Sequence, residues 1–227
     1  MEIVKKSLQY IGGMLLIAVG INLSKLTKLG ISPVSSIPRA VEQIWGVTLG
    51  TATIIIQLIC ILLQFVLLRK KFRPVNVLGV LVGVAFGWLI DLTGTDPKAF
   101  GHLMYGLPVP ASYWMRLLYM LISVVLIGAG VYLYLKPRWV PMATDGLSQA
   151  VAEVSGKPFG DCKTAVDTGM ILIAAILQVI FLGGLSSFVS PSVVVREGTV
   201  VAAVFVGQVV KLITRLVEKG SSRRESA

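Results

Sequence analysis

The sequence predicts an all-α polytopic membrane protein of six transmembrane helices, built as two inverted three-helix repeats that each include a short re-entrant or amphipathic helix. Three observations lead to this fold class: an apolar composition, six apolar segments of spanning length, and a repeat of the chain on itself. Of the 227 residues, 55% are hydrophobic and 14% are charged, and the mean hydropathy is +0.84. Because a soluble domain carries roughly 25% charged residues, we expect most of the surface to face lipid.

Six apolar segments are long enough to cross a bilayer, whose hydrocarbon core needs roughly 20 apolar residues per helix. They cover residues 8–25, 49–68, 75–92, 113–135, 160–182 and 195–216. The first is not expected to be a cleaved signal peptide, because no small-residue cleavage site with a polar start follows it. We therefore predict a single membrane domain over residues 1–227, in which residues 218–227 form a cytoplasmic tail.

The basic residues predict how these helices lie in the membrane. The strongest basic loop is formed by residues 69–73 (RKKFR), between the second and third spans. Loops on the cytoplasmic side are enriched in Lys and Arg, and a cytoplasmic N-terminus places this loop and most of the 21 basic residues there. Both termini are then cytoplasmic. The net charge of +10 is explained by this topology, and nucleic acid is not an expected partner because no basic stretch is interleaved with aromatic residues.

The two halves of the chain resemble each other. A shift of 110 residues aligns three pairs of glycines, namely Gly20 with Gly130, Gly46 with Gly156, and Gly50 with Gly160. The first repeat covers about residues 1–95 and the second about residues 112–217. Because each repeat has three spans, an odd number, the second copy must start from the opposite side of the membrane. Loop charge agrees, since residues 183–193, the counterpart of the basic loop, carry no charge.

A short helix is expected between the first and second spans of each repeat. Ser35 and Asp145 align in the repeat, and both residue types often cap helix N-termini. A helix of about eleven residues would run from each to Gly46 or Gly156, and would be about 16 Å long. Two interpretations stay open. The helices are re-entrant, with N-termini at mid-membrane that face a polar solute or anion, or they lie on the membrane surface with side chains such as Glu42 in water.

Polar residues at membrane depth form the predicted substrate site, since an unpaired charge there costs roughly 2.5–3.5 kcal/mol. Asp167 lies about two turns into the fifth span, and Gln57 is its counterpart in the first repeat. Asp167 contributes to a site between the repeats or pairs with Lys163, four residues earlier. Asp145 is a helix cap or a carboxylate that binds a proton or cation. The predicted substrate-binding residues are Ser32, Ser35, Ser36, Gln57, Thr144, Asp145, Ser148 and Asp167, of which Asp167 and Asp145 are also predicted to couple transport to an ion.

The sequence contains no pattern typical of an enzyme. A P-loop, an H-E-x-x-H motif, a G-x-S-x-G motif and a dinucleotide-binding fingerprint are all missing. The two cysteines, Cys60 and Cys162, are not spaced as metal ligands. We therefore expect no catalytic residue, cofactor or metal site. Gly79, Gly83 and Gly87 share one face of the third span, where they allow close packing within the chain or across a homodimer.

Residues 30–38 (GISPVSSIP) and their counterpart 141–147 (PMATDGL) resemble the YczE/YitT family of bacterial integral membrane proteins, and the similarity covers nearly the whole chain. The resemblance implies a multi-pass protein of the bacterial plasma membrane with a duplicated helical core, in a family often described as transport proteins. It implies no substrate and no catalytic residues.

We expect a secondary transporter or facilitator of a small polar solute, with anions among the candidates. Its partners are the lipid bilayer and the solute or coupling ion. The alternative is a non-transporting membrane scaffold or regulator that acts through a partner protein. The two differ in the core, because the alternative predicts a closed core in which Asp167 is paired and dry.

Overall fold

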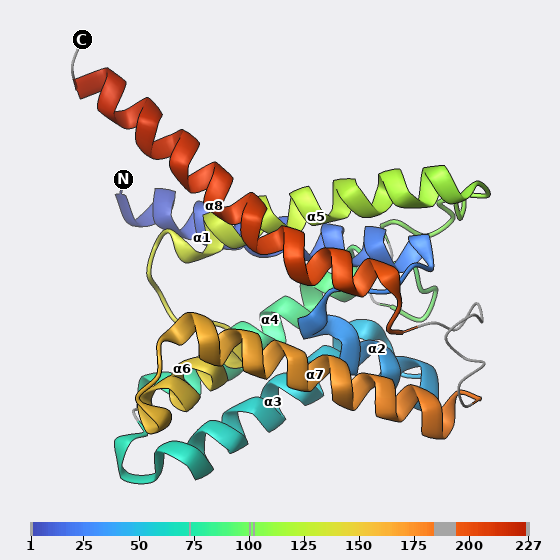
Figure 1. Cartoon of the computed structure of the whole chain (residues 1–227), viewed down its shortest axis with the longest axis horizontal. Helices are drawn as coiled ribbons and strands as arrows, with labels where there is room; N and C mark the ends of the chain where they lie inside the picture. Colours follow the sequence, from blue (N-terminus) through green and yellow to red (C-terminus); the bar gives the residue numbers. More distant parts are fainter. Residues whose placement is uncertain (1, 73, 100, 102, 184–193, 226–227) are drawn as a thin grey trace.

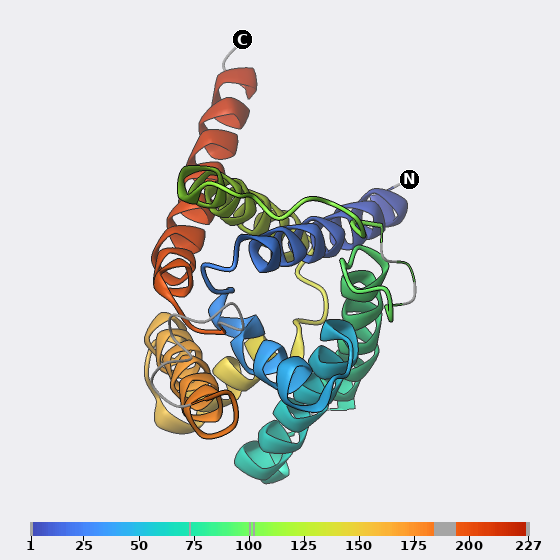
Figure 2. The same ribbon diagram turned by 90° about the vertical axis from the view of Figure 1, so that its right-hand side faces the viewer.

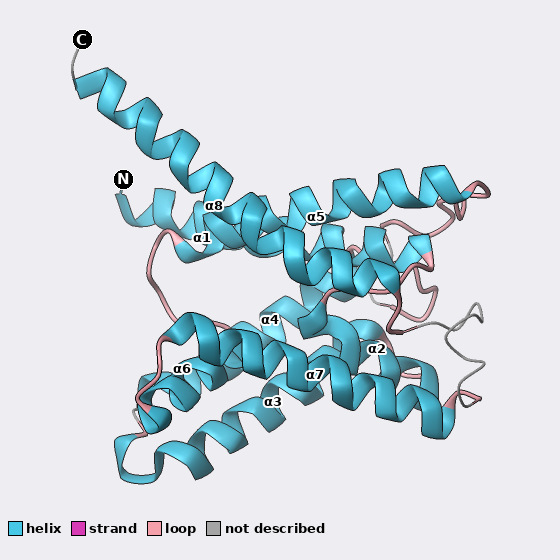
Figure 3. Ribbon diagram, viewed as in Figure 1, coloured by secondary structure: helices cyan, strands magenta, loops and turns pink. Residues whose placement is uncertain are grey.

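The computed structural model describes residues 2–72, 74–99, 101, 103–183 and 194–225, and this part of the chain is all-helical (Figure 3). Most of the loop at 183–193, which we predicted to be the uncharged counterpart of the basic loop, lies outside the described residues. The helices are α1 (Glu2–Thr27), α2 (Pro33–Trp45), α3 (Leu49–Leu68), α4 (Leu78–Leu92), α5 (Tyr113–Leu135), α6 (Ala143–Ser155), α7 (Phe159–Phe181) and α8 (Glu197–Glu225), with 3₁₀ turns η1 (Arg69–Lys71) and η2 (Pro74–Val77).

Five helices are long and apolar enough to cross a membrane, namely α1, α3, α5, α7 and α8, so the chain has the features of a membrane protein. The predicted third span begins later than expected. Its α-helix, α4, has 15 residues, because the chain first makes the 3₁₀ turn η2, which starts at Pro74. At the other end of the chain, α8 continues to Glu225, so much of the predicted tail prolongs the last helix.

The helices surround a common axis, as the end-on view shows (Figure 2). α1 packs extensively against α5, while α3 packs against α4 and α6, and α2 packs against α7. The described ends of the chain lie at one end of the molecule, together with the connection from α3 to α4 (Figure 1). The N-terminal half (α1 to α4) and the C-terminal half (α5 to α8) therefore contact each other along the whole bundle.

Glycines bring the helix backbones close together. A Cβ atom on Gly13 of α1 would lie 2.5 Å from the backbone N of Tyr134 on α5. On α4, a Cβ atom on Gly83 would lie 2.8 Å from Cβ of Gln57, and one on Gly87 would lie 2.7 Å from the carbonyl oxygen of Gly50. The small-residue face of α4 thus packs against α3 within the chain.

The short helices α2 and α6 end as predicted but begin earlier. Their C-caps are Gly46 (φ +67°) and Gly156 (φ +70°), in the left-handed conformation that glycine adopts readily. The prediction that Ser35 and Asp145 are the N-caps is wrong: the N-caps are Ser32 and Met142. Proline fits the first position of α2 because it has no N–H to satisfy there, and alanine, the strongest helix former, begins α6.

The N-termini of both short helices lie against the middle of a long helix of the other half. In α6, the backbone N–H of Thr144 donates to Oε1 of Gln57 near the middle of α3, at 3.2 Å. In α2, the hydroxyl of Ser36 donates to the carbonyl oxygen of Met170 near the middle of α7, at 3.3 Å. A helix that lay flat across one end of the bundle would not reach these positions.

Candidate functional site

A cavity of about 590 Å³ lies between the two halves of the chain. Residues of α1, α3, α4 and α6 line it, together with the segment that precedes α6. Lys71 and Arg138 at its mouth follow the last residues of α3 and α5, so the cavity lies at the end of the molecule where these helices finish. Its inner wall includes Ala143 and Gly146, from the first turn of α6. The cavity thus extends from one end of the bundle to the α6 N-terminus.

Charged side chains lie at the mouth of the cavity, and two tyrosine hydroxyls further in bind the segment before α6. Nζ of Lys71 lies 3.9 Å from Oε1 of Glu153, and both side chains are at least half exposed. Deeper in, the hydroxyl of Tyr10 donates to the carbonyl oxygen of Val140 at 2.7 Å. The hydroxyl of Tyr134 accepts a hydrogen bond from the backbone N–H of Met142. These two bonds fix the segment that leads into α6.

The N-terminus of α6 is held by two amide side chains of α3. No side chain of its own N-cap accepts a hydrogen bond there. Oε1 of Gln57 accepts from the backbone N–H of Thr144, and Nε2 of Gln64 donates to the carbonyl oxygen of Ala143 at 2.9 Å. Gln57 is only 2% exposed, and its Nε2 atom is buried without a hydrogen-bond partner in the described part of the chain. An unused donor therefore lies at this helix end.

Lys163 joins the two predicted carboxylates. Its Nζ atom lies 3.1 Å from Oδ1 of Asp145 on α6 and 2.8 Å from Oδ1 of Asp167 on α7. All three side chains are about one quarter exposed. Asp167 is thus paired with Lys163, one of the two alternatives that the sequence allowed. Among the described residues, no group of three His, Cys, Asp or Glu side chains could hold a metal ion.

The remaining predicted site residues are hydroxyls at the two short-helix N-termini. On α2, the hydroxyl of Ser32 donates to that of Ser35 at 3.2 Å, and that of Ser36 also contacts the carbonyl oxygen of Pro33 at 2.6 Å. On α6, the hydroxyl of Ser148 donates to the carbonyl oxygen of Thr144 at 3.2 Å. The eight predicted residues therefore form two groups, one at each N-terminus. No direct hydrogen bond or ion pair joins Gln57 to Asp167, but both lie beside the start of α6.

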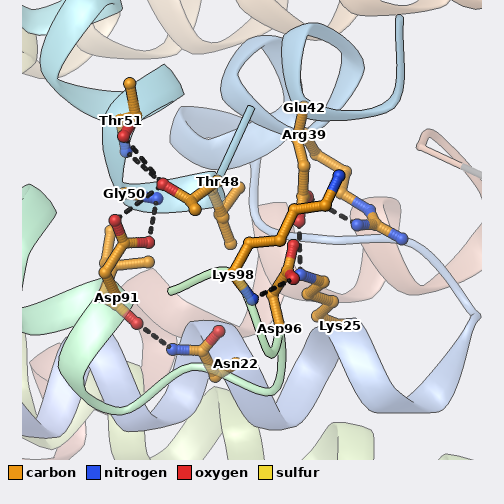
Figure 4. Close-up of polar contacts among 12 residues, drawn as sticks. Asn22, Lys25, Arg39, Glu42, Thr48, Gly50, Thr51, Asp91, Asp96 and Lys98 are labelled. Carbon is orange, nitrogen blue, oxygen red and sulfur yellow. Dashed lines mark hydrogen bonds and ion pairs between the residues drawn. The ribbon is translucent and has the colours of Figure 1, made fainter. Parts of the chain in front are cut away.

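A buried ion cluster on α2 was not predicted from the sequence (Figure 4). The carboxylate of Glu42, only 7% exposed, lies between Lys25 at the end of α1 and Arg39 one turn earlier on α2. Oε2 of Glu42 lies 2.5 Å from Nη1 of Arg39, and Oε1 contacts Nζ of Lys25. The spacing from Arg39 to Glu42 is a local signal for that pair, but the sequence does not indicate that Lys25 would meet them.

Asp91 is a second residue whose role the sequence did not indicate. Its Oδ1 atom accepts from the backbone N–H of Gly50 at 2.8 Å, and its Oδ2 atom accepts from the hydroxyl of Thr48 at 2.7 Å (Figure 4). Nearby, Nδ2 of Asn22 donates to the carbonyl oxygen of Ile90 at 2.8 Å. These contacts join α1, α3 and α4 where α4 ends and α3 begins, which is the end of the bundle away from the cavity mouth.

The model of a family of unknown function (DUF6198) matches residues 4–215. The uncharacterized protein YyaS of Bacillus subtilis (strain 168) is 27% identical over 173 residues, which are 76% of this chain and 81% of that protein. No solved structure matches. The resemblance to the YczE/YitT family stays a prediction.

Proposed function

The chain belongs to the DUF6198 family, and we propose that it is a secondary transporter or facilitator of a small polar solute in the bacterial plasma membrane. The cavity between the two halves carries this proposal. Its volume of about 590 Å³ is within the range of small-molecule sites, which are concave and have a few convergent polar groups. In transporters built from repeats, the substrate binds between the repeats near mid-membrane, at the ends of broken helices.

The proposed topology has six spans, with α4 as a short third span, in two inverted three-helix repeats. Reciprocal packing supports it, because α6 packs against α3 as α2 packs against α7, while α1 packs against α5. The position of both chain ends beside the basic α3–α4 connection supports cytoplasmic termini (Figure 1). In this topology α2 and α6 are re-entrant, with their N-termini near the middle of the membrane.

The cavity then opens to the cytoplasm, and the opposite end is closed. The closing contacts are the Lys25–Glu42–Arg39 cluster and the hydrogen bonds of Asp91 to the start of α3. Alternating access requires that one repeat move against the other around the site. We infer that the Glu42 cluster separates when the path opens to the outside.

Asp145 and Asp167 are the proposed coupling residues. The two carboxylates share the single ammonium group of Lys163, so the cluster carries a net charge of −1 when all three groups are ionised. A proton on one carboxylate would make the cluster neutral and release one of its two ion pairs. Proton binding would thereby loosen the contact between α6 and α7, which is the physical link that a proton-coupled cycle needs.

Uptake by the reconstituted protein tests this proposal. A thermal-shift screen of metabolites and ions between pH 5 and 8 first identifies a solute that stabilises the purified protein. Proteoliposomes with a pH gradient should then accumulate that solute, and Asp167→Asn should abolish proton-driven uptake while leaving expression intact. Asp161→Asn, in the exposed first turn of the same helix, is the matched control and should keep wild-type uptake. Unchanged uptake by Asp167→Asn would remove Asp167 from the mechanism.

One observation favours the alternative of a scaffold or regulator, because Asp167 is paired with Lys163 as that alternative predicts. The cavity favours transport, because a scaffold has no use for a cavity that extends to mid-bundle and has charged and amide side chains in its wall. If no member of a broad solute library shifts the melting temperature, the scaffold becomes the better account and the search turns to a partner protein.

A further inference from the structure

We propose that the N-terminus of α6 binds a small anion, and that Nε2 of Gln57 donates a hydrogen bond to it. The inference rests on the proposed function and deepens it, because it names the chemical class of the solute. It also assigns the solute-binding atom of Gln57.

The orientation of the Gln57 amide leaves a donor unused. Its Oε1 atom accepts from the backbone N–H of Thr144 at 3.2 Å. A flipped amide would place Nε2 against that N–H, donor against donor, so the contact fixes which atom is which. Nε2 is then a buried donor with no acceptor among the described residues. Buried donors are nearly always satisfied in native proteins, and a ligand with acceptor oxygens or a halide would satisfy this one.

The end of α6 adds positive potential at the same place. Helix N-termini carry a partial positive charge from their free N–H groups and are common anion sites. No N-cap side chain accepts from these groups in α6. The carboxylate of Asp145 lies in this first turn and shares Lys163 with Asp167, so the positive potential of the helix end is largest when one of these carboxylates is protonated. The cavity instead meets Ala143, Gly146 and Ala150, which lie on another face of the helix.

The cavity leads to the first turn of α6 beside this site, although Gln57 itself does not line it. Gln64, which lines the cavity, lies two turns after Gln57 on the same face of α3. Gly79 lines the cavity from α4, and Gly83, one turn deeper, packs directly against the Gln57 side chain. At the mouth, the charge of Glu153 is balanced by the nearby ammonium group of Lys71. The positive charge of the exposed Arg138 is then in excess and attracts anions to the mouth.

Anion-dependent melting of the purified protein in detergent tests the inference. Sodium salts of chloride, nitrate, acetate, phosphate and sulfate are compared at constant ionic strength, with glycerol as a neutral solute. At least one anion should raise the melting temperature with a saturable dose dependence. Gln57→Glu keeps the acceptor for Thr144 but replaces the donor with a negative oxygen, so it should raise the apparent Kd at least tenfold.

Gln178→Glu is the matched control. Gln178 is equally buried, its Oε1 atom accepts from the backbone N–H groups of Val194 and Val195, and its Nε2 atom also has no partner in the described part of the chain. Because Gln178 contacts the segment that precedes α8 and not the N-terminus of α6, this variant should bind the anion as the wild type does. Arg138→Gln at the exposed cavity mouth keeps the test decisive if Gln57→Glu fails to fold, and it should raise the apparent Kd about threefold or more.

The inference is overturned if no anion has a saturable effect on the melting temperature, or if glycerol alone raises it. It is also overturned if Gln57→Glu binds the anion as tightly as the wild type. Where Gln57→Glu does not fold, the same result for Arg138→Gln overturns it. Its failure is distinguishable from failure of the proposed function. An anion that binds through Gln57 but is never taken up by proteoliposomes supports this site and contradicts transport. Uptake of a neutral solute without any anion effect supports transport and contradicts this site.

Discussion

Removal of the Glu42 carboxylate should destabilise the protein strongly. Its side chain is 7% exposed, and the cations on either side, Lys25 and Arg39, are 12% and 17% exposed. Glu42→Ala would leave two cations side by side with little access to water. Loss of one partner from a buried ion pair costs about 3–5 kcal/mol. Since 1 kcal/mol shifts Tm by roughly 2–4 °C in chains of this size, we expect Tm to fall by roughly 6–20 °C.

Thermal unfolding in detergent, followed by tryptophan fluorescence, measures this effect. Glu153→Ala is the control, because its pair with Lys71 is long (3.9 Å) and exposed, and such pairs contribute less than about 1 kcal/mol. Replacement of all three residues, Lys25, Arg39 and Glu42, by Met should recover most of the lost stability, because no charge is then left buried. The reasoning is refuted if Glu42→Ala melts within about 2 °C of the wild type, or if the triple variant melts lower than the single one.

Two further predictions concern stability and helix contacts. Gly13→Ala should lower the free energy of unfolding by about 1–3 kcal/mol, because its Cβ would lie 2.5 Å from a backbone atom of Tyr134. The control Gly12→Ala should raise that free energy by up to about 1 kcal/mol, because a Cβ on Gly12 has nothing within 4 Å. Equal melting temperatures of the two variants would contradict this prediction. Asp91→Ala should lower the free energy of unfolding by about 1–3 kcal/mol, because the backbone N–H of Gly50 loses its acceptor. An unchanged urea midpoint in detergent would contradict this and would show that water replaces the carboxylate.

Features encoded by a local stretch of sequence were predictable. Hydropathy over 20 residues located α3 and α5 at their observed bounds, because burial in lipid requires apolar residues on all sides of a helix. Gly46 and Gly156 located the ends of α2 and α6, because few other residues adopt the left-handed conformation readily. The spacing of four residues allowed the pair of Lys163 and Asp167 as one of two alternatives, and the structure has that pair.

Features that depend on contacts between distant segments were not predictable. Lys25 meets Glu42 only because the end of α1 lies beside α2. Asp91 accepts hydrogen bonds from the start of α3, some 40 residues earlier in the chain, and no local pattern in the sequence indicates that contact. Asp145 has an intrinsic preference for the N-cap, but packing of the α6 N-terminus against Gln57 places it inside the helix.

Thiol accessibility in membrane vesicles tests most directly whether a solute path opens between the halves on the cytoplasmic side. A cysteine replaces Gln149, an exposed residue of the cavity wall on α6, in a chain whose buried Cys60 and Cys162 are changed to Ala. A membrane-impermeant maleimide should label this cysteine in inside-out vesicles and leave it unlabelled in right-side-out vesicles. Labelling from the outside only, or from neither side, would contradict the account.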